Sequence, residues 1–173
     1  MITLEGLFVI FITWIFVIPI SWLLSRYLEG VFSSGNRILD RFLEPAENFL
    51  YKITGVDQNK GMGWKEYFKA LLLVNFLEMI FAFILLIFQG NLPLDPMHFP
   101  DVSIPLAFNI AVSFGTNTNL QHYAGETTLS YLSQMAVIQF LQFASAATGL
   151  SAGIAMIRGF SGKTGNLGNF YRD

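Results

Sequence analysis

A stretch of 29 residues without any charged side chain, Leu129 to Ile157, is the feature that most constrains the fold. Two further apolar stretches, Leu7 to Ser25 and Tyr67 to Phe88, also approach the roughly 20 helical residues that cross a bilayer. Soluble domains carry about 25% charged residues, whereas this chain of 173 residues carries 13%. The sequence therefore predicts an all-α membrane protein with three spanning helices.

Composition excludes several other classes of protein. The chain has no cysteine, which rules out disulfides and thiolate metal sites. Its net charge of -2 gives no indication of a nucleic-acid partner, and membrane lipid is the expected surrounding. A cleaved signal peptide fits the first stretch poorly, because Glu5 precedes it and no basic residue does. His98 and His122 are expected to face solvent rather than to bind a metal.

The placement of basic residues predicts the orientation in the membrane. Seven of the ten Lys and Arg residues lie between Arg26 and Lys69, and the other three follow the third apolar stretch. None lies in the first six residues or between Gln89 and Thr128. The positive-inside rule then puts the N-terminus and the segment 89–128 outside, and the 26–69 connection and the C-terminus inside.

The inner connection alternates apolar and charged residues at near-helical spacing. The apolar residues are Ile38, Leu39, Phe42, Phe49, Leu50 and Ile53, and the charged ones are Arg37, Asp40, Arg41, Glu44 and Glu47. This pattern predicts one or two short amphipathic helices, broken at Pro45, on the membrane surface. An interfacial connector is favoured over a docking surface.

A shorter apolar run, Val102 to Phe114, follows a proline-rich outer loop, Gln89 to Asp101. Its helix would be about 20 Å long, too short to span the bilayer. Asp101 or Ser103 is expected to cap its start, and Pro105 lies in the first turn, where proline is allowed. The run predicts a helix that enters the membrane without crossing it.

This run ends in Ser113 to Gly115 and continues as the polar segment Thr116 to Asn119, which is the layout of a pore loop. The C-terminal end of the helix would direct its partial negative charge toward a cation. Gly115 would let backbone carbonyls turn inward, and the Thr and Asn side chains would hold the return by hydrogen bonds. The alternative is an outer loop that only covers the protein, and spacing does not name the ion.

The segment from Phe108 to Gln121, FNIAVSFGTNTNLQ, closely resembles the first pore loop of the potassium-binding subunit (KdpA) of bacterial potassium-transporting P-type ATPases. The resemblance covers nearly the whole chain. It includes Tyr123 to Tyr131, Gly55 to Asp57 with Met62, Trp64 and Tyr67, and Ala144 to Gly149.

The resemblance implies a potassium-channel-like helix–pore loop–helix repeat preceded by one extra transmembrane helix, with four repeats around one filter. The implied filter residues are Thr116, Asn117, Thr118 and Asn119, with Gly115 at the base and Gln121 at the outer end. A potassium ion would be held by the backbone carbonyls of Thr116, Asn117 and Thr118.

The implied function is to bind extracellular potassium and pass it inward within an ATP-driven, high-affinity uptake complex of the bacterial inner membrane. The chain lacks a phosphate loop and an Asp-Lys-Thr-Gly-Thr phosphorylation motif, so it is not expected to be an enzyme by itself. Its partners would be an ATP-hydrolysing P-type ATPase subunit and accessory membrane subunits. The alternative is a passive potassium channel, or a structural membrane subunit with a similar loop.

Two features depart from the family pattern. Family members are much longer, so this chain is expected to be an N-terminal portion, or the remaining repeats lie on another chain. Glu78 stands where a small residue is expected. It is open whether Glu78 faces a partner subunit, pairs with Asn75 or lies near a polar cavity.

The sequence predicts a division into a leading transmembrane helix (1–26), a cytoplasmic connection (27–66), a first pore repeat (67–158) and a truncated cytoplasmic tail (159–173). Within the repeat, the predicted parts are a transmembrane helix (67–88), the outer loop (89–101), the pore helix (102–114), the filter (115–121) and a second transmembrane helix (129–157). The segment Gly162 to Asn169 is expected to act as a connector.

Overall fold

The computed structural model describes residues 3–30, 40–162 and 165–173, and in these residues all regular structure is helical. It divides into two compact units, Met1–Val56 and Asp57–Asp173. Three of the described helices are long and apolar enough to cross a membrane: α1 (Leu4–Glu29), α3 (Trp64–Ile87) and a continuous helix, Tyr131–Phe160. The all-α fold and the three long apolar helices are confirmed.

In the first unit, α1 extends beyond the predicted stretch at both ends. The Oγ1 of Thr3 caps its start by accepting a hydrogen bond from the Gly6 amide at 3.1 Å. Pro19 lies inside the helix without ending it. Near the other end, the Arg26 guanidinium lies 5.0 Å from the ring centroid of Trp22. An aromatic ring beside a basic side chain is typical of the end of a span, at the membrane interface.

The second helix of this unit, α2 (Asp40–Thr54), shows that the predicted break at Pro45 is wrong. The helix continues through Pro45, whose missing amide leaves only one carbonyl, four residues earlier, without its usual donor. Leu43, Leu50 and Ile53 are exposed in the described part of α2. The predicted helical residues Arg37, Ile38 and Leu39, and the side chains of Asp40, Arg41 and Phe42, lie outside what is described.

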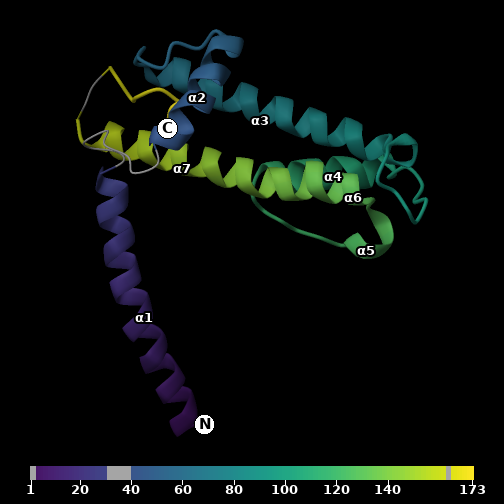
Figure 1. Ribbon diagram of the computed structural model, residues 1–173, viewed down its shortest axis with the longest axis horizontal. Coiled ribbons are helices and arrows are strands. Elements are labelled where there is room, and N and C mark those ends of the chain that lie inside the picture. Colours follow the sequence, from purple (N-terminus) through teal and green to yellow (C-terminus); the bar gives the residue numbers. More distant parts are fainter. Residues whose placement is uncertain (1–2, 31–39, 163–164) are drawn as a thin grey trace. The chain divides into compact units, whose positions relative to one another are not determined.

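The second unit is built around a short helix that packs on two long ones (Figure 1). The short helix α4 (Ile104–Gly115) contacts both α3 and α7 (Phe140–Phe160), and these two long helices run side by side. A 3-10 turn, η2 (Gln89–Asn91), follows α3, and a single helical turn, α5 (Gly125–Thr128), precedes the third long helix.

The third long helix changes its winding along its length. It begins as α6 (Tyr131–Ser133), continues as a π-helical stretch, η3 (Gln134–Gln139), and becomes α7. The Oγ of Ser130 caps it by accepting a hydrogen bond from the Ser133 amide at 3.1 Å. Leu129, predicted to be helical, has extended backbone instead, so the helix starts two residues later than expected.

Apolar side chains from the long helices and α4 meet in one cluster. Its fully buried large members are Leu86, Ile110, Phe114, Leu129, Val137 and Leu141. Between spanning helices lipid tails are as apolar as these side chains, so close van der Waals packing holds such a cluster together. The cluster therefore fixes α4, and with it the loop that follows, against both long helices.

The start of α4 differs from the predicted capping. Ser103 occupies the N-cap position, but its side chain accepts no backbone hydrogen bond. Pro105 lies in the first turn as predicted, and it removes one of the two amides that an N-cap side chain normally binds. The Oδ1 of Asp101 accepts a hydrogen bond from the Gly90 amide at 2.9 Å instead.

The C-terminal residues 165–173 pack on the chain just before α3. The Leu167 amide donates to the Met62 carbonyl at 2.9 Å, and the Met62 amide donates to the Gly168 carbonyl at 2.7 Å. The ring of Phe170 packs edge-on against Tyr67, with 5.6 Å between centroids. The described part of the predicted connector is therefore held by backbone pairing, while Lys163 and Thr164 lie outside the described residues.

Candidate functional site

The loop after α4 folds back onto the last turn of that helix. All four amides of residues 116–119 donate hydrogen bonds to carbonyls of α4, at 2.9–3.2 Å. The pairs are Thr116 to Val112, Asn117 to Phe114, and Thr118 and Asn119 to Ser113. Carbonyls at the end of a helix lack intrahelical donors, so this arrangement satisfies them within the chain.

The carbonyls of the same four residues have a different environment from the amides. Among the described residues, none donates a hydrogen bond to the carbonyl oxygens of 116–119. Asn117 and Asn119 have left-handed backbone, with φ of 56° and 53°, while Thr116 has φ of -93° and ψ of 6°. Asparagine is one of the few residues that tolerates the left-handed region. The loop therefore has all four of its backbone amides paired, while its backbone carbonyls are available to bind another group.

Ser113 ties the far end of the loop to α4. Its buried Oγ accepts a hydrogen bond from the Leu120 amide at 2.7 Å and donates to the Leu120 carbonyl at 3.2 Å. From the sequence, Ser113 was predicted only to end the apolar run, with no partner of its own. The sequence signal was a hydroxyl at the end of a mostly apolar helix, seven residues before the residue that it binds.

Side chains of the loop also bind one another, as the sequence predicted. The Thr116 and Thr118 hydroxyl oxygens lie 2.9 Å apart, and the Asn119 Nδ2 donates to the Asn117 Oδ1 at 3.1 Å. The Thr116 hydroxyl also lies 2.8 Å from the Val112 carbonyl, to which it donates. These bonds join alternate residues of the loop and stiffen it.

Gln121 lies outside this bonded segment. Its Nε2 donates to the Tyr123 hydroxyl at 3.2 Å, and its side chain is exposed. Burial raises the pKa of Tyr123 above its ordinary value, and the hydrogen bond from Gln121 partly opposes that rise. The structure thus brings residues 115–119 together in one bonded segment and places Gln121 beside it, paired with Tyr123.

Gly115 permits the end of α4 to approach α3 closely. A Cβ at this position would lie 2.6 Å from the Cγ and 2.9 Å from the Cε of Met79. Any larger residue would displace Met79 or the helix end. Met79 was not identified from the sequence, because nothing in an apolar helix marks which side chain meets a distant glycine.

A second polar centre, around Gln89, connects the segments on either side of α4. Gln89 is fully buried, and its Nε2 donates to the carbonyls of Pro100, at 2.7 Å, and Thr128, at 2.8 Å. Its Oε1 accepts from the Ser133 hydroxyl at 2.9 Å and the Ser130 amide at 3.3 Å. All four hydrogen-bonding positions of this amide are used. From the sequence, Gln89 was predicted only to be the first residue of the outer loop.

The other polar residues singled out in the sequence behave differently from one another. Asn75 donates to the Leu71 carbonyl at 2.8 Å, and no hydrogen bond joins Asn75 to Glu78 among the described residues. The Oε2 of Glu78 is buried without a hydrogen-bond partner among the described residues. His98 and His122 are exposed, as expected.

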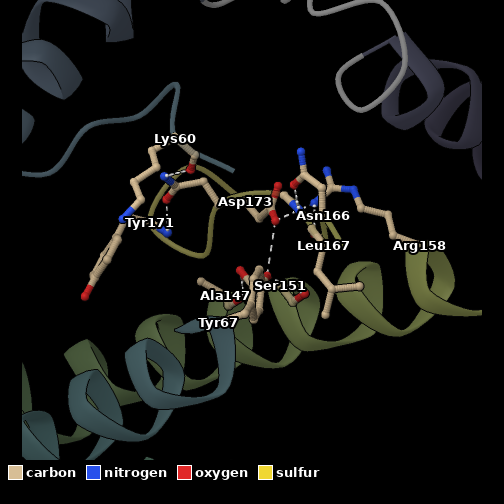
Figure 2. A network of polar contacts seen from close by, with 11 residues as sticks. Lys60, Tyr67, Ala147, Ser151, Arg158, Asn166, Leu167, Tyr171 and Asp173 are labelled. Carbon is tan, nitrogen blue, oxygen red and sulfur yellow. Dashed lines mark hydrogen bonds and ion pairs between the residues drawn. The ribbon is translucent and has the colours of Figure 1, made fainter. Parts of the chain in front are cut away.

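A separate polar network joins α3, α7 and the tail (Figure 2). The Tyr67 hydroxyl donates to the Ser151 carbonyl at 2.8 Å and contacts the Asp173 carboxylate at 3.2 Å. Arg158 pairs with the same carboxylate at 2.5 Å and donates to the Leu167 carbonyl at 2.8 Å. The two charges of this network, on Arg158 and Asp173, are paired with each other, so we assign the network a structural role.

The long apolar helices and the short helix between two of them define a multi-pass membrane protein. A family model described as the potassium-transporting ATPase A subunit, KdpA, matches residues 10–173. The chain belongs to this family, as the sequence resemblance predicted.

Proteins similar to the chain carry the name potassium-transporting ATPase potassium-binding subunit. That of Caldanaerobacter subterraneus subsp. tengcongensis is 49% identical over 150 residues, which are 87% of this chain and 27% of the relative. Those of Alicyclobacillus acidocaldarius and Nostoc sp. are 45% and 46% identical over 172 and 170 residues, or 99% and 98% of this chain. The chain spans 31% and 30% of these two relatives.

Proposed function

We propose that residues 115–121 form one segment of a potassium filter, in which the carbonyls of Thr116, Asn117 and Thr118 bind the ion. The observation that carries this proposal is the division of the loop into amides that are paired and carbonyls that accept no hydrogen bond from the described part of the chain. Carbonyl oxygens replace the hydration shell of potassium in such filters. Gly115 lies at the base of the segment, Asn119 continues it, and Gln121 stands at its outer end.

Electrostatics favour a cation at this place. The C-terminal end of α4 carries a partial negative charge of roughly half an elementary charge. The segment 113–121 contains no basic or acidic side chain that would repel the ion or bind it tightly. A site built from neutral dipoles suits an ion that must be held selectively and then released inward.

One such segment does not surround an ion, and the exposure of residues 116–122 supports a larger assembly. We propose that residues 67–158 are one helix–pore loop–helix repeat, that α1 precedes it, and that further repeats complete the filter. In this arrangement the unpaired carbonyls face a shared axis. Irregular backbone within a membrane requires such protein or water around it.

The proposed orientation follows from charge. Residues 26–69 and the C-terminus, which hold all the basic residues, would lie in the cytoplasm, and α4 would enter the membrane from outside. The chain would then present its loop to extracellular potassium. An ATP-hydrolysing subunit and accessory membrane subunits of the same pump would supply the energy, and this chain would not hydrolyse ATP.

The test is the potassium dependence of ATP hydrolysis by the pump reconstituted with the full-length subunit. We expect Gln121→Ala and Asn119→Ala each to raise the half-saturating potassium concentration by about threefold to tenfold, the range of one lost hydrogen bond. His122→Ala, an exposed neighbour, is the matched control and should leave this value unchanged. Unchanged affinity in both variants would falsify the site assignment. Potassium flux without ATP would instead support the alternative of a passive channel.

A further inference from the structure

An apolar groove between α3 and the third long helix contains one polar lining residue, Glu78. The groove has a volume of about 720 Å³. It is lined by Leu77, Glu78, Phe81, Leu132, Met135, Ala136 and Phe140. The Oε2 of Glu78 is buried and has no hydrogen-bond partner among the described residues. The nearest side-chain amide along the helix, that of Asn75, donates to the Leu71 carbonyl, and among the described residues it makes no hydrogen bond with Glu78.

A carboxyl group in this position needs a partner from elsewhere. Placing an acidic residue at the centre of a spanning helix costs roughly 2.5–3.5 kcal/mol, and such residues usually pair with another polar group. No basic residue lines the groove. Whether it is ionised or neutral, the Glu78 carboxyl offers an acceptor oxygen, and a hydrogen-bond donor on the occupant of the groove would satisfy it in both states.

The depth of Glu78 in the membrane excludes lipid as the source of that donor. Glu78 lies nine residues from the nearer end of α3, or about 14 Å along the helix axis. The next residue, Met79, packs against Gly115 at the base of the loop. Lipid headgroups lie at the edges of a hydrocarbon core of about 30 Å, so lipid tails cannot supply a donor at this depth. A protein side chain can.

We propose that a second transmembrane helix of the assembled pump occupies this groove and donates a hydrogen bond to Glu78 from a Lys, Arg, His, Asn or Gln side chain. Ala136 lets the helix approach closely, and the Leu, Phe and Met side chains pack against its apolar residues. This inference rests on the proposed function, because it requires an assembly of spanning helices around this chain.

Photo-cross-linking in the complete pump tests this inference. Benzoylphenylalanine would replace either Phe81, in the groove, or Phe76, which is exposed on the same helix outside it. We expect the probe at Phe81 to attach to a peptide that contains a donor residue, in clearly higher yield than the probe at Phe76. Adducts with lipid only, or equal peptide yields at both positions, would overturn the proposal.

The role of Glu78 is tested in the same cross-linking background. A hydrogen bond between spanning helices contributes about 0.6–1.7 kcal/mol. We therefore expect Glu78→Leu to lower the yield at Phe81 by about threefold to fifteenfold. Leu73→Met, an apolar exchange at an exposed position of the same helix outside the groove, should leave it unchanged. An unchanged yield in Glu78→Leu would refute the pairing. If the Glu78→Leu pump fails to assemble, the comparison of the probes at Phe81 and Phe76 in the pump that retains Glu78 still tests whether a helix occupies the groove.

The two proposals fail in different measurements. A misplaced filter would show as unchanged potassium affinity in Gln121→Ala, and it would leave the cross-link at Phe81 intact. An empty or lipid-filled groove would show in the adducts at Phe81, and it would leave the effect of Gln121→Ala intact.

Discussion

Two polar centres flank α4, and they differ in how fully their groups are paired. Before α4, the Gln89 side chain uses both donors and both acceptor positions on four partners within the chain. After α4, the loop 116–119 pairs every amide but leaves every carbonyl without a donor among the described residues. The Gln89 centre connects segments that are distant in the sequence, and the bonds of the loop hold a sharp turn at the end of α4.

The difference separates a structural centre from a candidate ligand site. Buried polar groups in folded proteins nearly always find partners, so a fully paired centre such as Gln89 requires nothing further. A row of carbonyls without donors, held in place by paired amides, remains available for a cation. Substitutions at the first centre should therefore change stability, and substitutions at the second should change ion affinity.

The largest expected effect is at Gln89. Gln89→Leu would remove the acceptor of the buried Ser130 amide and Ser133 hydroxyl, and it would leave the carbonyls of Pro100 and Thr128 without this donor. Each buried group left without a partner costs about 1–3 kcal/mol. We expect a loss of about 2–5 kcal/mol of stability, seen as a much lower midpoint of thermal unfolding for the detergent-solubilised subunit. Gln121→Leu, at an exposed glutamine, is the control. Equal midpoints for both variants would contradict the structural role of Gln89.

Gly115→Ala should have the next largest effect, because the new Cβ would overlap Met79. Overpacking of this kind costs typically 1–3 kcal/mol. We expect the variant to shift the base of the loop and to weaken potassium binding in the reconstituted pump. The double variant with Met79→Ala should recover much of the affinity. If Met79→Ala gives no recovery, the close contact is not what requires glycine.

Ser113→Ala should have a moderate effect on the loop alone. It removes the two hydrogen bonds to Leu120, each of which contributes about 0.5–1.5 kcal/mol. The two bonds together amount to about 1–3 kcal/mol, so we expect potassium affinity to fall by about fivefold to 140-fold, with little change in the unfolding midpoint. Ser103→Ala, at a serine whose side chain makes no capping bond, should change neither quantity. A larger effect at Ser103 than at Ser113 would reverse this ranking.

The smallest effect is expected from Tyr123, and only at high pH. Because burial raises its pKa, the folded chain holds the phenol proton more tightly than the unfolded chain does. Its contribution to stability is therefore complete below the ordinary tyrosine pKa of about 10 and is lost as pH rises above it. Unfolding midpoints from pH 7 to pH 11 should show this fall. Tyr123→Phe should remove that part of the pH dependence.

Much of the helical layout follows from the sequence alone. Length and hydropathy predict α1, α3 and the third long helix, because a spanning helix needs a fixed number of apolar residues. The short run before Gly115 predicts α4 for the same reason. The predicted break at Pro45 was wrong, since proline prevents only one hydrogen bond near the described start of α2.

The contacts that position the loop are harder to predict. Gln89 with Thr128 and Gly115 with Met79 join residues 39 and 36 positions apart, and only the packed fold brings them together. The Thr and Asn hydrogen bonds of the loop were predictable, because their partners lie two residues away. Local chemistry is thus readable in the sequence, whereas long-range packing is not.

The two left-handed asparagines have a further consequence for the loop. Glycine would adopt this backbone without strain, but it would also give the unbound loop many more conformations to lose on ordering. Asparagine restricts that freedom in advance, and the bond between Asn119 and Asn117 restricts it further. In the proposed filter, the loop would therefore need less ordering when an ion arrives, which would favour rapid exchange of ions over slow rearrangement of the backbone.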